Sequence, residues 1–229
     1  MQENNSAFAL KLFEPKTLKQ INENGQRLYV TETGDKYPSV TTALGALGKK
    51  KIWEWRKRVG AEAANKISMQ ASRAGTAVHN IAEDYILGVT RDKEINPIAL
   101  NTFRTIQPYL DENVDEVYGV ELRMFSDTLK TAGTTDLICR YNGKNTILDF
   151  KTSKRWKKID EIKTYFMQGA AYAQMAKEHY DFDVERIVIL MAVGQGEGAL
   201  VFDEDVNDWL PMTKKYFDLY HKGKINVWN

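Results

Sequence analysis

The chain has few residues of the types that build disulfides, thiolate metal sites and hydrolase triads. Its 229 residues include one cysteine, Cys139, and three histidines. A single cysteine excludes an internal disulfide framework and any four-cysteine zinc or iron–sulfur site. With three histidines and no serine or cysteine nucleophile paired to one, a triad hydrolase is disfavoured. Cys139 lies in an apolar segment and is expected to fill the core.

Long apolar runs and nucleotide-binding loops are lacking as well. No segment reaches the roughly 20 apolar residues of a membrane-spanning helix, and residues 1–5 do not resemble a secretory signal. The phosphate-binding pattern G-x-x-x-x-G-K-[ST] is absent, so the chain is not expected to use ATP. We therefore predict an intracellular, cytoplasmic protein without a membrane partner.

Positive charge is clustered although the chain as a whole is nearly neutral. The net charge of +1 gives no overall attraction to nucleic acid. Residues 49–58 and 154–158 each combine Lys and Arg with tryptophan. Such runs suit a phosphate backbone with stackable bases, although a solvated helix face has the same composition. We expect Lys154, Arg155 and Trp156 to contact a substrate, and residues 49–58 leave both interpretations open.

The order of apolar and turn segments predicts one α/β domain over residues 1–229, with a small mixed sheet between helices. Residues 1–113 are expected to form a β and helical part that covers the site, and residues 114–229 the core. The most regular helix is expected over Ala61–Leu87, ended by Gly88. The other expected elements are strands at 7–10 and 27–32, a helix start near Ser39, a helix from Pro97 through Leu110, strands at 117–125, 136–141 and 146–151, a helix at 159–180, strands at 186–193 and 199–202, and a helix at 206–221.

Two acidic segments on successive expected strands carry the strongest chemical signal. They are Gly133-Thr134-Thr135-Asp136 and Asp149-Phe150-Lys151, joined through an Asn142-Gly143 turn of the kind tight hairpins prefer. Because side chains alternate along a strand, Asp149 and Lys151 point the same way while Phe150 points to the core. The two carboxylates and the Phe150 carbonyl would offer the oxygen ligands that Mg²⁺ and Mn²⁺ favour.

The Asp149-x-Lys151 triplet also has a simpler interpretation. Such triplets occur in any charged chain, and the two side chains would then form a structural ion pair. The apolar residues Ile147 and Leu148 indicate that the charges emerge from a buried strand, where an isolated charge is costly. We therefore favour a metal site with Lys151 beside it.

Side chains on the expected long helix fall where they could complete such a site. His79 and Glu83 are one turn apart on one face of this helix. Small residues around Gly75 would let the helix approach the sheet closely enough for His79 to reach a metal or phosphate. Arg73 is a candidate phosphate contact, with a solvated side chain as the alternative.

Three further residues are candidates on neighbouring elements. Glu121 lies on the strand before Asp136, either beside the other carboxylates or exposed. Gln168 and Tyr172 share a face of the helix that follows Lys151. Gln168 would bond a ligand or a phosphate, and Tyr172 would stack on a base, although such residues are more often structural.

In chain order, the motifs Gly75-x-x-x-His79, Glu121, Gly133-x-x-Asp136, Asp149-x-Lys151 and Gln168-x-x-x-Tyr172 resemble the RecB-like branch of the PD-(D/E)XK nuclease superfamily. The segment Pro38-Ser39-Val40-Thr41 resembles the start of the mitochondrial genome maintenance exonucleases and their phage relatives. The resemblance spans roughly residues 36–195. Motifs in this order are more specific than any one of them alone.

The resemblance implies a restriction-endonuclease-like core and a site that uses Mg²⁺ or Mn²⁺. The implied metal ligands are His79, Glu121, Asp136, Asp149 and the Phe150 carbonyl. Lys151 would be the catalytic lysine, acting with the three acids, and Gln168 with Tyr172 the trailing motif. Asp136 stands for the first acid without the preceding proline, and the single cysteine excludes the relatives that hold an iron–sulfur cluster.

Together these features predict a metal-dependent DNA exonuclease that hydrolyses phosphodiester bonds, on single-stranded ends, in DNA replication, recombination or repair. No helicase portion is present, so unpaired DNA is expected from a helicase or another replication or recombination partner. A phage-encoded protein would act in the host cytoplasm. A structure- or sequence-specific endonuclease on the same fold and a non-catalytic nucleic-acid-binding accessory protein are the alternatives.

Overall fold

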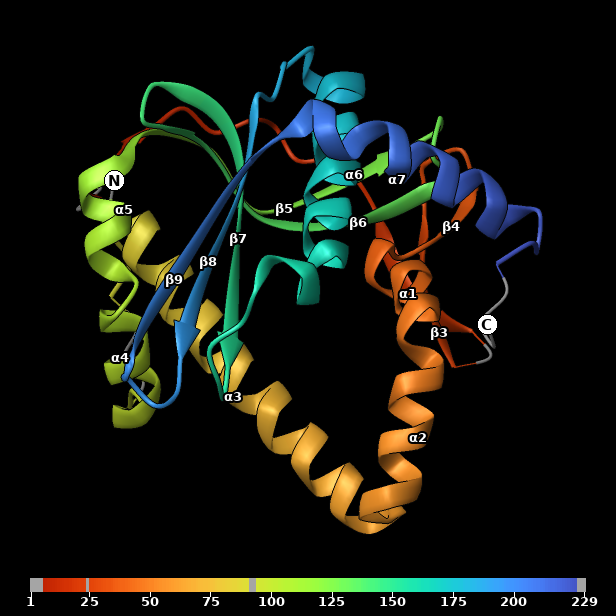
Figure 1. The fold of residues 1–229 in the computed structure, drawn as a ribbon. Coiled ribbons are helices and arrows are strands. Elements are labelled where there is room, and N and C mark those ends of the chain that lie inside the picture. Colours follow the sequence, from red (N-terminus) through yellow and green to blue (C-terminus); the bar gives the residue numbers. More distant parts are fainter. Residues whose placement is uncertain (1–5, 24, 91–93, 226–229) are drawn as a thin grey trace.

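A six-stranded mixed sheet with helices against both faces forms the body of the protein (Figure 1). The computed structural model describes residues 6–23, 25–90 and 94–225. The strands, in spatial order, are β1 (Ala9–Leu10), β5 (Val114–Ser126), β6 (Thr131–Tyr141), β7 (Lys144–Ser153), β8 (Arg186–Val193) and β9 (Gly198–Asp205). The pairs β5–β6, β6–β7 and β8–β9 are antiparallel, and β7–β8 is parallel. The expected α/β class with a mixed sheet is confirmed.

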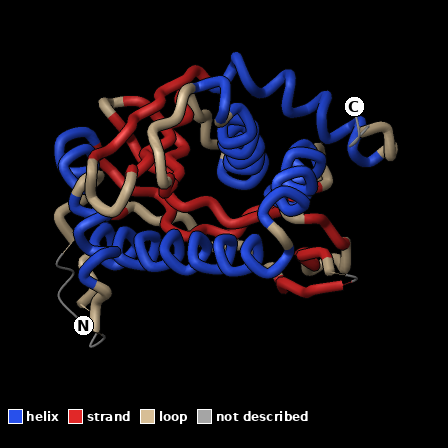
Figure 2. Tube along the Cα trace, turned by 60° about the horizontal axis from the view of Figure 1, so that its bottom comes forward, coloured by secondary structure: helices blue, strands red, loops and turns tan. Residues whose placement is uncertain are grey.

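Two helical layers bury the two faces of this sheet. On one face lie α6 (Lys163–Tyr180) and α7 (Val206–His221); on the other lie α3 (Ala61–Leu87), α4 (Pro97–Arg104) and α5 (Gln107–Asn113). Figure 2 shows α3 running along one face of the sheet. In β7, Ile147 packs into the α6 side while Leu148 and Phe150 pack into the α3 side. This alternation is the one expected of a strand and places Asp149 on the α6 side.

Several local signals act as the sequence indicates. Helix α3 has the expected bounds and ends at Gly88, whose φ of 64° is the left-handed conformation that glycine adopts at low cost. Ser39 caps the helix start by accepting the Thr42 N–H at 3.1 Å. Asn142 and Gly143 have φ of 50° and 73°, as a tight primed turn between β6 and β7 requires. The expected bounds of β8 and α7 are also confirmed.

The expected single helix from Pro97 through Leu110 is wrong, because α4 and α5 are separate. Pro108 has no N–H to donate to the preceding turn, so α4 ends at Arg104 and a new helix starts with this proline in its first turn. The helix expected at 159–180 likewise divides into a 3₁₀ turn, η2 (Ile159–Glu161), and α6. The first expected strand is limited to β1.

A second, three-stranded antiparallel sheet was only partly expected. It consists of β2 (Lys19–Glu23), β3 (Gln26–Val30) and β4 (Lys36–Pro38). The carbonyl of Pro38 accepts a hydrogen bond from Thr131 Oγ1 at 2.8 Å, which ties this sheet to the start of β6. The N-terminal part therefore joins the main sheet next to the segment that carries Gly133.

A helical arm extends from the body at the bottom of Figure 1. After α1 (Val40–Gly45) and η1 (Ala46–Gly48), helix α2 (Lys49–Val59) runs outward without a buried residue and turns at Gly60 into α3. Within the first sixteen residues of α3, only Ala64 is buried. Each helix in the described part of the chain is too short or too polar to cross a bilayer.

Candidate metal centre

The sheet forks beside the acidic segments. Strands β6 and β7 pair as far as Leu137 and Leu148; beyond that point β6 stays with β5 and β7 stays with β8. The backbone N–H of Phe150 faces the fork and donates to Asp136 Oδ2 at 2.8 Å. Because the N–H and C=O of a strand residue point to the same side, the Phe150 carbonyl faces the fork too. Its role as a metal ligand stays a prediction.

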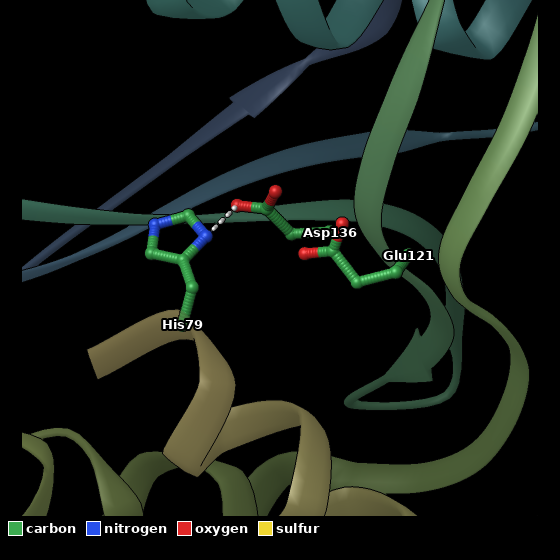
Figure 3. A group of neighbouring side chains, drawn as sticks. All are labelled: His79, Glu121 and Asp136. Carbon is green, nitrogen blue, oxygen red and sulfur yellow. Dashed lines mark ion pairs between the residues drawn. The ribbon is translucent and has the colours of Figure 1, made fainter. Parts of the chain in front are cut away.

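Three side chains from three elements meet in this fork (Figure 3). His79 of α3, Glu121 of β5 and Asp136 of β6 each present one ligand atom, and these atoms all lie within 4.8 Å of one another. His79 Nδ1 is 3.5 Å from Asp136 Oδ2. An imidazole and two carboxylates form a donor set that fits a divalent cation such as Mn²⁺ or Mg²⁺. The sequence analysis placed all three residues among the metal ligands.

Close packing of α3 against β7 brings His79 to the fork. The imidazole packs edge-on against the Phe150 ring, with the ring centroids 6.0 Å apart. One turn earlier, a Cβ added to Gly75 would lie 3.6 Å from Thr152 Oγ1. This is an ordinary van der Waals distance, so α3 lies close to the end of β7 here, and a small side chain at this position would also fit.

Glu121 owes its position to an unusual backbone conformation. The register pairs Val120 with Leu137 and Leu122 with Thr135, so Glu121 stands opposite Asp136. Its φ is 46°, a left-handed value that non-glycine residues rarely adopt inside a strand. Such outliers cost about 1–3 kcal/mol and persist where the surroundings enforce them, often at functional sites. Glu121 therefore lies beside Asp136, one of the two positions expected for it from the sequence.

Burial and neighbouring charges shift the pKa values of all three residues. Partial burial of its carboxyl group, followed by the negative charge of Asp136, raises the pKa of Glu121 to about 7, although the residue as a whole is exposed. Burial opposes ionisation of Asp136, but the hydrogen bond and charge of His79 outweigh it and hold the pKa of Asp136 below its usual range. Burial opposes protonation of His79, and Asp136 reverses this, so the pKa of His79 is raised.

Asp149 and Lys151 form a buried ion pair next to the three ligands. The Lys151 ammonium contacts Asp149 Oδ2, and Gln168 Nε2 donates to Asp149 Oδ1 at 2.8 Å. Asp149 is only 1% exposed, and its burial raises its pKa to about 6 despite the charge of Lys151. Both of its oxygens contact protein donors, and Asp149 is not one of the three residues whose ligand atoms lie together, so its role as a metal ligand stays a prediction.

Tyr165 is a site residue that the sequence analysis missed. Lys151 Nζ lies 5.0 Å from the centre of the Tyr165 ring, a cation–π contact. Tyr165 and Gln168 are one turn apart on α6, so the start of this helix touches both members of the ion pair. The spacing from Gln168 was a signal that could have identified Tyr165.

Tyr172 does not have the base-stacking position that was expected. It is 2% exposed, and a Cβ added to Gly133 would lie 2.7 Å from its hydroxyl oxygen. The Tyr172 ring occupies the space that a side chain at position 133 would need, so only glycine fits there without a shift of the ring. The expected stacking on a base is therefore wrong, because the Tyr172 ring is buried and packs against Gly133.

The remaining expected substrate contacts lie around the site rather than in it. Lys154 and Trp156 are exposed on the loop after β7. Arg155 is also exposed and forms an ion pair with Glu161 on the same loop, and its expected substrate contact stays a prediction. Arg73 is exposed on α3 and lines a cavity of about 320 Å³ that also includes Thr152.

Comparison with known proteins gives little help with this site. No protein-family model and no curated protein matches the chain. It is similar to a solved structure described as "Crystal structure of SSO0001", with 14% sequence identity, a TM-score of 0.44, and coverage of 82% of this chain and 76% of that chain. At this level the likeness carries no argument, and the chemistry of the site rests on its own residues.

Proposed function

We propose that this protein is a metal-dependent DNA exonuclease with a PD-(D/E)XK core of the RecB-like type. The observation that carries the proposal is the grouping of His79, Glu121 and Asp136 within 4.8 Å, beside the buried Asp149–Lys151 pair at the fork of the sheet. A carboxylate-rich donor set next to a lysine is the equipment that phosphodiester hydrolysis needs.

The donor set fits a divalent cation of the Mg²⁺ or Mn²⁺ type. His79, Glu121 and Asp136 would hold it, and the Phe150 carbonyl faces the same fork. Asp149 is the neighbouring acid, held by Lys151 and Gln168. When bound, such an ion supplies an activated water and neutralises charge on the phosphate. Burial of its carboxyl group and then the charge of Asp136 raise the pKa of Glu121 to about 7, and a bound cation would oppose both effects by favouring the carboxylate.

Lys151 is the residue that we place closest to the developing charge. Asp149 and the Tyr165 ring hold the ammonium in place, so the Lys151 side chain would not have to change its conformation to contact the phosphate. Gln168 holds the far oxygen of Asp149 and fixes the orientation of that carboxylate. Hydrolysis would add water across the P–O bond, leaving a 5′-phosphate and a 3′-hydroxyl.

The helical arm supports action on a single strand with a free end. Helix α2 carries the basic residues 49–51 and 56–58, and its side chains are not part of the core. Among them, Lys57 Nζ lies 4.2 Å from the centre of the Trp53 ring. A cationic, aromatic arm suits a phosphate backbone with unpaired bases. The arm gives the exonuclease proposal its preference over the endonuclease alternative.

The test is cleavage of end-labelled DNA by the full chain with Mg²⁺. We expect wild type to shorten a linear single strand and to leave a closed circular single strand intact. Lys151→Met and Asp136→Asn should each lose roughly 100-fold or more in rate, because each removes a group that stabilises the transition state. Lys215→Met, at an exposed position of α7, is the matched control and should cleave at the wild-type rate. Cut circles would favour the endonuclease alternative, and undiminished cleavage by both site variants would refute the assignment.

A further inference from the structure

One exposed aromatic side chain stands on the loop that leaves β7 after Lys151. Trp156 is 54% exposed, whereas Trp209 of α7 is 8% exposed and stacks on Phe166 in the core. An indole contributes most to stability when it is buried. The exposed ring of Trp156 therefore needs an explanation other than core packing.

Hydrogen bonds hold the backbone on both sides of Trp156. Ser153 Oγ donates to the Arg155 carbonyl at 2.7 Å and accepts the Arg155 N–H at 3.3 Å. Arg155 Nη1 donates to the Trp156 carbonyl at 3.1 Å. The Arg155 guanidinium also pairs with Glu161, which accepts the Lys158 N–H at 2.9 Å. The loop is closed on itself, and the exposed indole projects from a fixed base.

The indole also packs against Gly198 of β9, the strand on the far side of β8 from β7. A Cβ added to Gly198, the first residue of β9, would lie 3.0 Å from Trp156 Cη2 and 3.3 Å from Cζ2. The far edge of the ring therefore rests where Gly198 has no side chain. A Cβ at this position would require the ring to shift by a few tenths of an ångström, and a branched side chain would require a larger shift.

The charges around the ring select the class of ligand. Lys154 and Lys158 are exposed on the same loop, and Lys157 is half-buried, 3.9 Å from Glu161. A fixed aromatic surface among ammonium groups suits a nucleobase on a phosphate backbone, because the base stacks while the phosphates meet the cations. A double helix keeps its bases stacked inside and offers no face to this ring.

The chain length between the two residues limits which nucleotide is involved. Five residues lead from Lys151 to Trp156, and an extended chain advances at most about 3.4 Å per residue. The backbone at Trp156 thus lies within roughly 17 Å of that at Lys151. A stacked strand advances about 3.4 Å per nucleotide, so this backbone separation corresponds to about five nucleotides, to which the reach of the two side chains adds.

We propose that Trp156 is a stacking platform for an unpaired nucleobase close to the cleaved bond, and that it gives the protein its preference for single-stranded DNA. This inference rests on the proposed function, since it places the strand across the fork. The ring would contact the flat face of a base, which every unpaired base presents, and not the hydrogen-bonding edge that differs between bases. It would therefore favour unpaired strands of any sequence.

The test is equilibrium binding of the full chain to labelled oligonucleotides without divalent ions. Two single strands of equal length are compared, one of thymidine and one of abasic sites with the same phosphate charge. Trp156→Ala should weaken binding of the thymidine strand about tenfold and leave the abasic strand unchanged. Trp156→Phe keeps a ring and should stay within about threefold of wild type. Gly198→Val, which requires the ring to shift, should fall between them.

The outcomes separate this inference from the proposed function. Equal weakening of both strands by Trp156→Ala, or no weakening of either, overturns the stacking platform. If wild type cleaves single strands and Trp156→Ala binds and cleaves them equally well, the platform fails while the nuclease proposal stands. If the thymidine-specific loss appears but wild type cleaves no DNA under any metal condition, the platform stands as a binding site and the nuclease proposal fails.

Discussion

Glu121→Gln tests whether the fork is built for a cation at the expense of stability. The pKa of Glu121 rises from its ordinary 4.5 to about 7 in the folded protein, chiefly through burial of its carboxyl group and the charge of Asp136. The folded protein thus favours the protonated carboxyl group, and ionisation of Glu121 lowers the free energy of unfolding. This loss of stability is absent below about pH 4.5 and complete above about pH 7. At 1.36 kcal/mol per pKa unit, this rise corresponds to about 3.4 kcal/mol.

Solvent reduces this figure, since Glu121 is exposed as a whole and its charge is partly screened. We expect the metal-free glutamine variant to be about 1 kcal/mol more stable than wild type at pH 8. The advantage should disappear as the pH falls to about 4.5, where both side chains are neutral. With Mn²⁺, wild type should become the more stable of the two proteins, because the Glu121 carboxylate then binds the cation.

The assay is urea unfolding followed by circular dichroism, with chelator or with Mn²⁺, at several pH values. Asp208→Asn, at an acidic residue exposed on α7, provides a control for removal of one negative charge. The reasoning is refuted if Glu121→Gln is no more stable than wild type at pH 8 without metal, or if its stability difference does not change with pH.

Three further predictions concern the packing around the fork. Gly133→Ala places a Cβ 2.7 Å from the Tyr172 hydroxyl and should destabilise the protein by about 1–3 kcal/mol in urea unfolding; an unchanged midpoint would contradict the close approach. Asp149→Asn leaves Lys151 without its counter-charge and should cost about 3 kcal/mol, whereas adding Lys151→Met should recover stability but not activity; no recovery in the double variant would argue against the buried pair as the cause. Tyr165→Leu should lower kcat with little change in KM while Tyr165→Phe keeps most activity, and an equal loss in both variants would speak against the ring as the group that positions Lys151.

The elements with strong local signals could be predicted from the sequence. Gly88 ends α3 because a left-handed residue satisfies the last carbonyls of the helix. Strand β8 is apolar after Arg186 because β7 and β9 cover its edges and helices cover its faces. By contrast β2 is exposed and polar, so its sequence shows neither a strand period nor a helix period.

The candidate site could be predicted as a set of residues but not as a geometry. The left-handed φ of Glu121 results from the register of two long strands, which no local pattern encodes. The burial of Tyr172 depends on its contact with Gly133, distant in the chain. The engagement of Arg155 by Glu161 depends on how the loop folds back after β7. Each depends on how the surrounding chain folds, which the residue type alone does not reveal.

Binding of Mn²⁺ by the full chain, measured by the loss of the free-ion electron paramagnetic resonance signal, shows directly whether the fork holds a divalent cation. Wild type and Lys215→Met should bind the ion saturably, and Asp136→Asn should bind it roughly tenfold or more weakly because a carboxylate at the fork is lost. Absence of saturable binding by wild type, or equal binding by Asp136→Asn, would contradict the account.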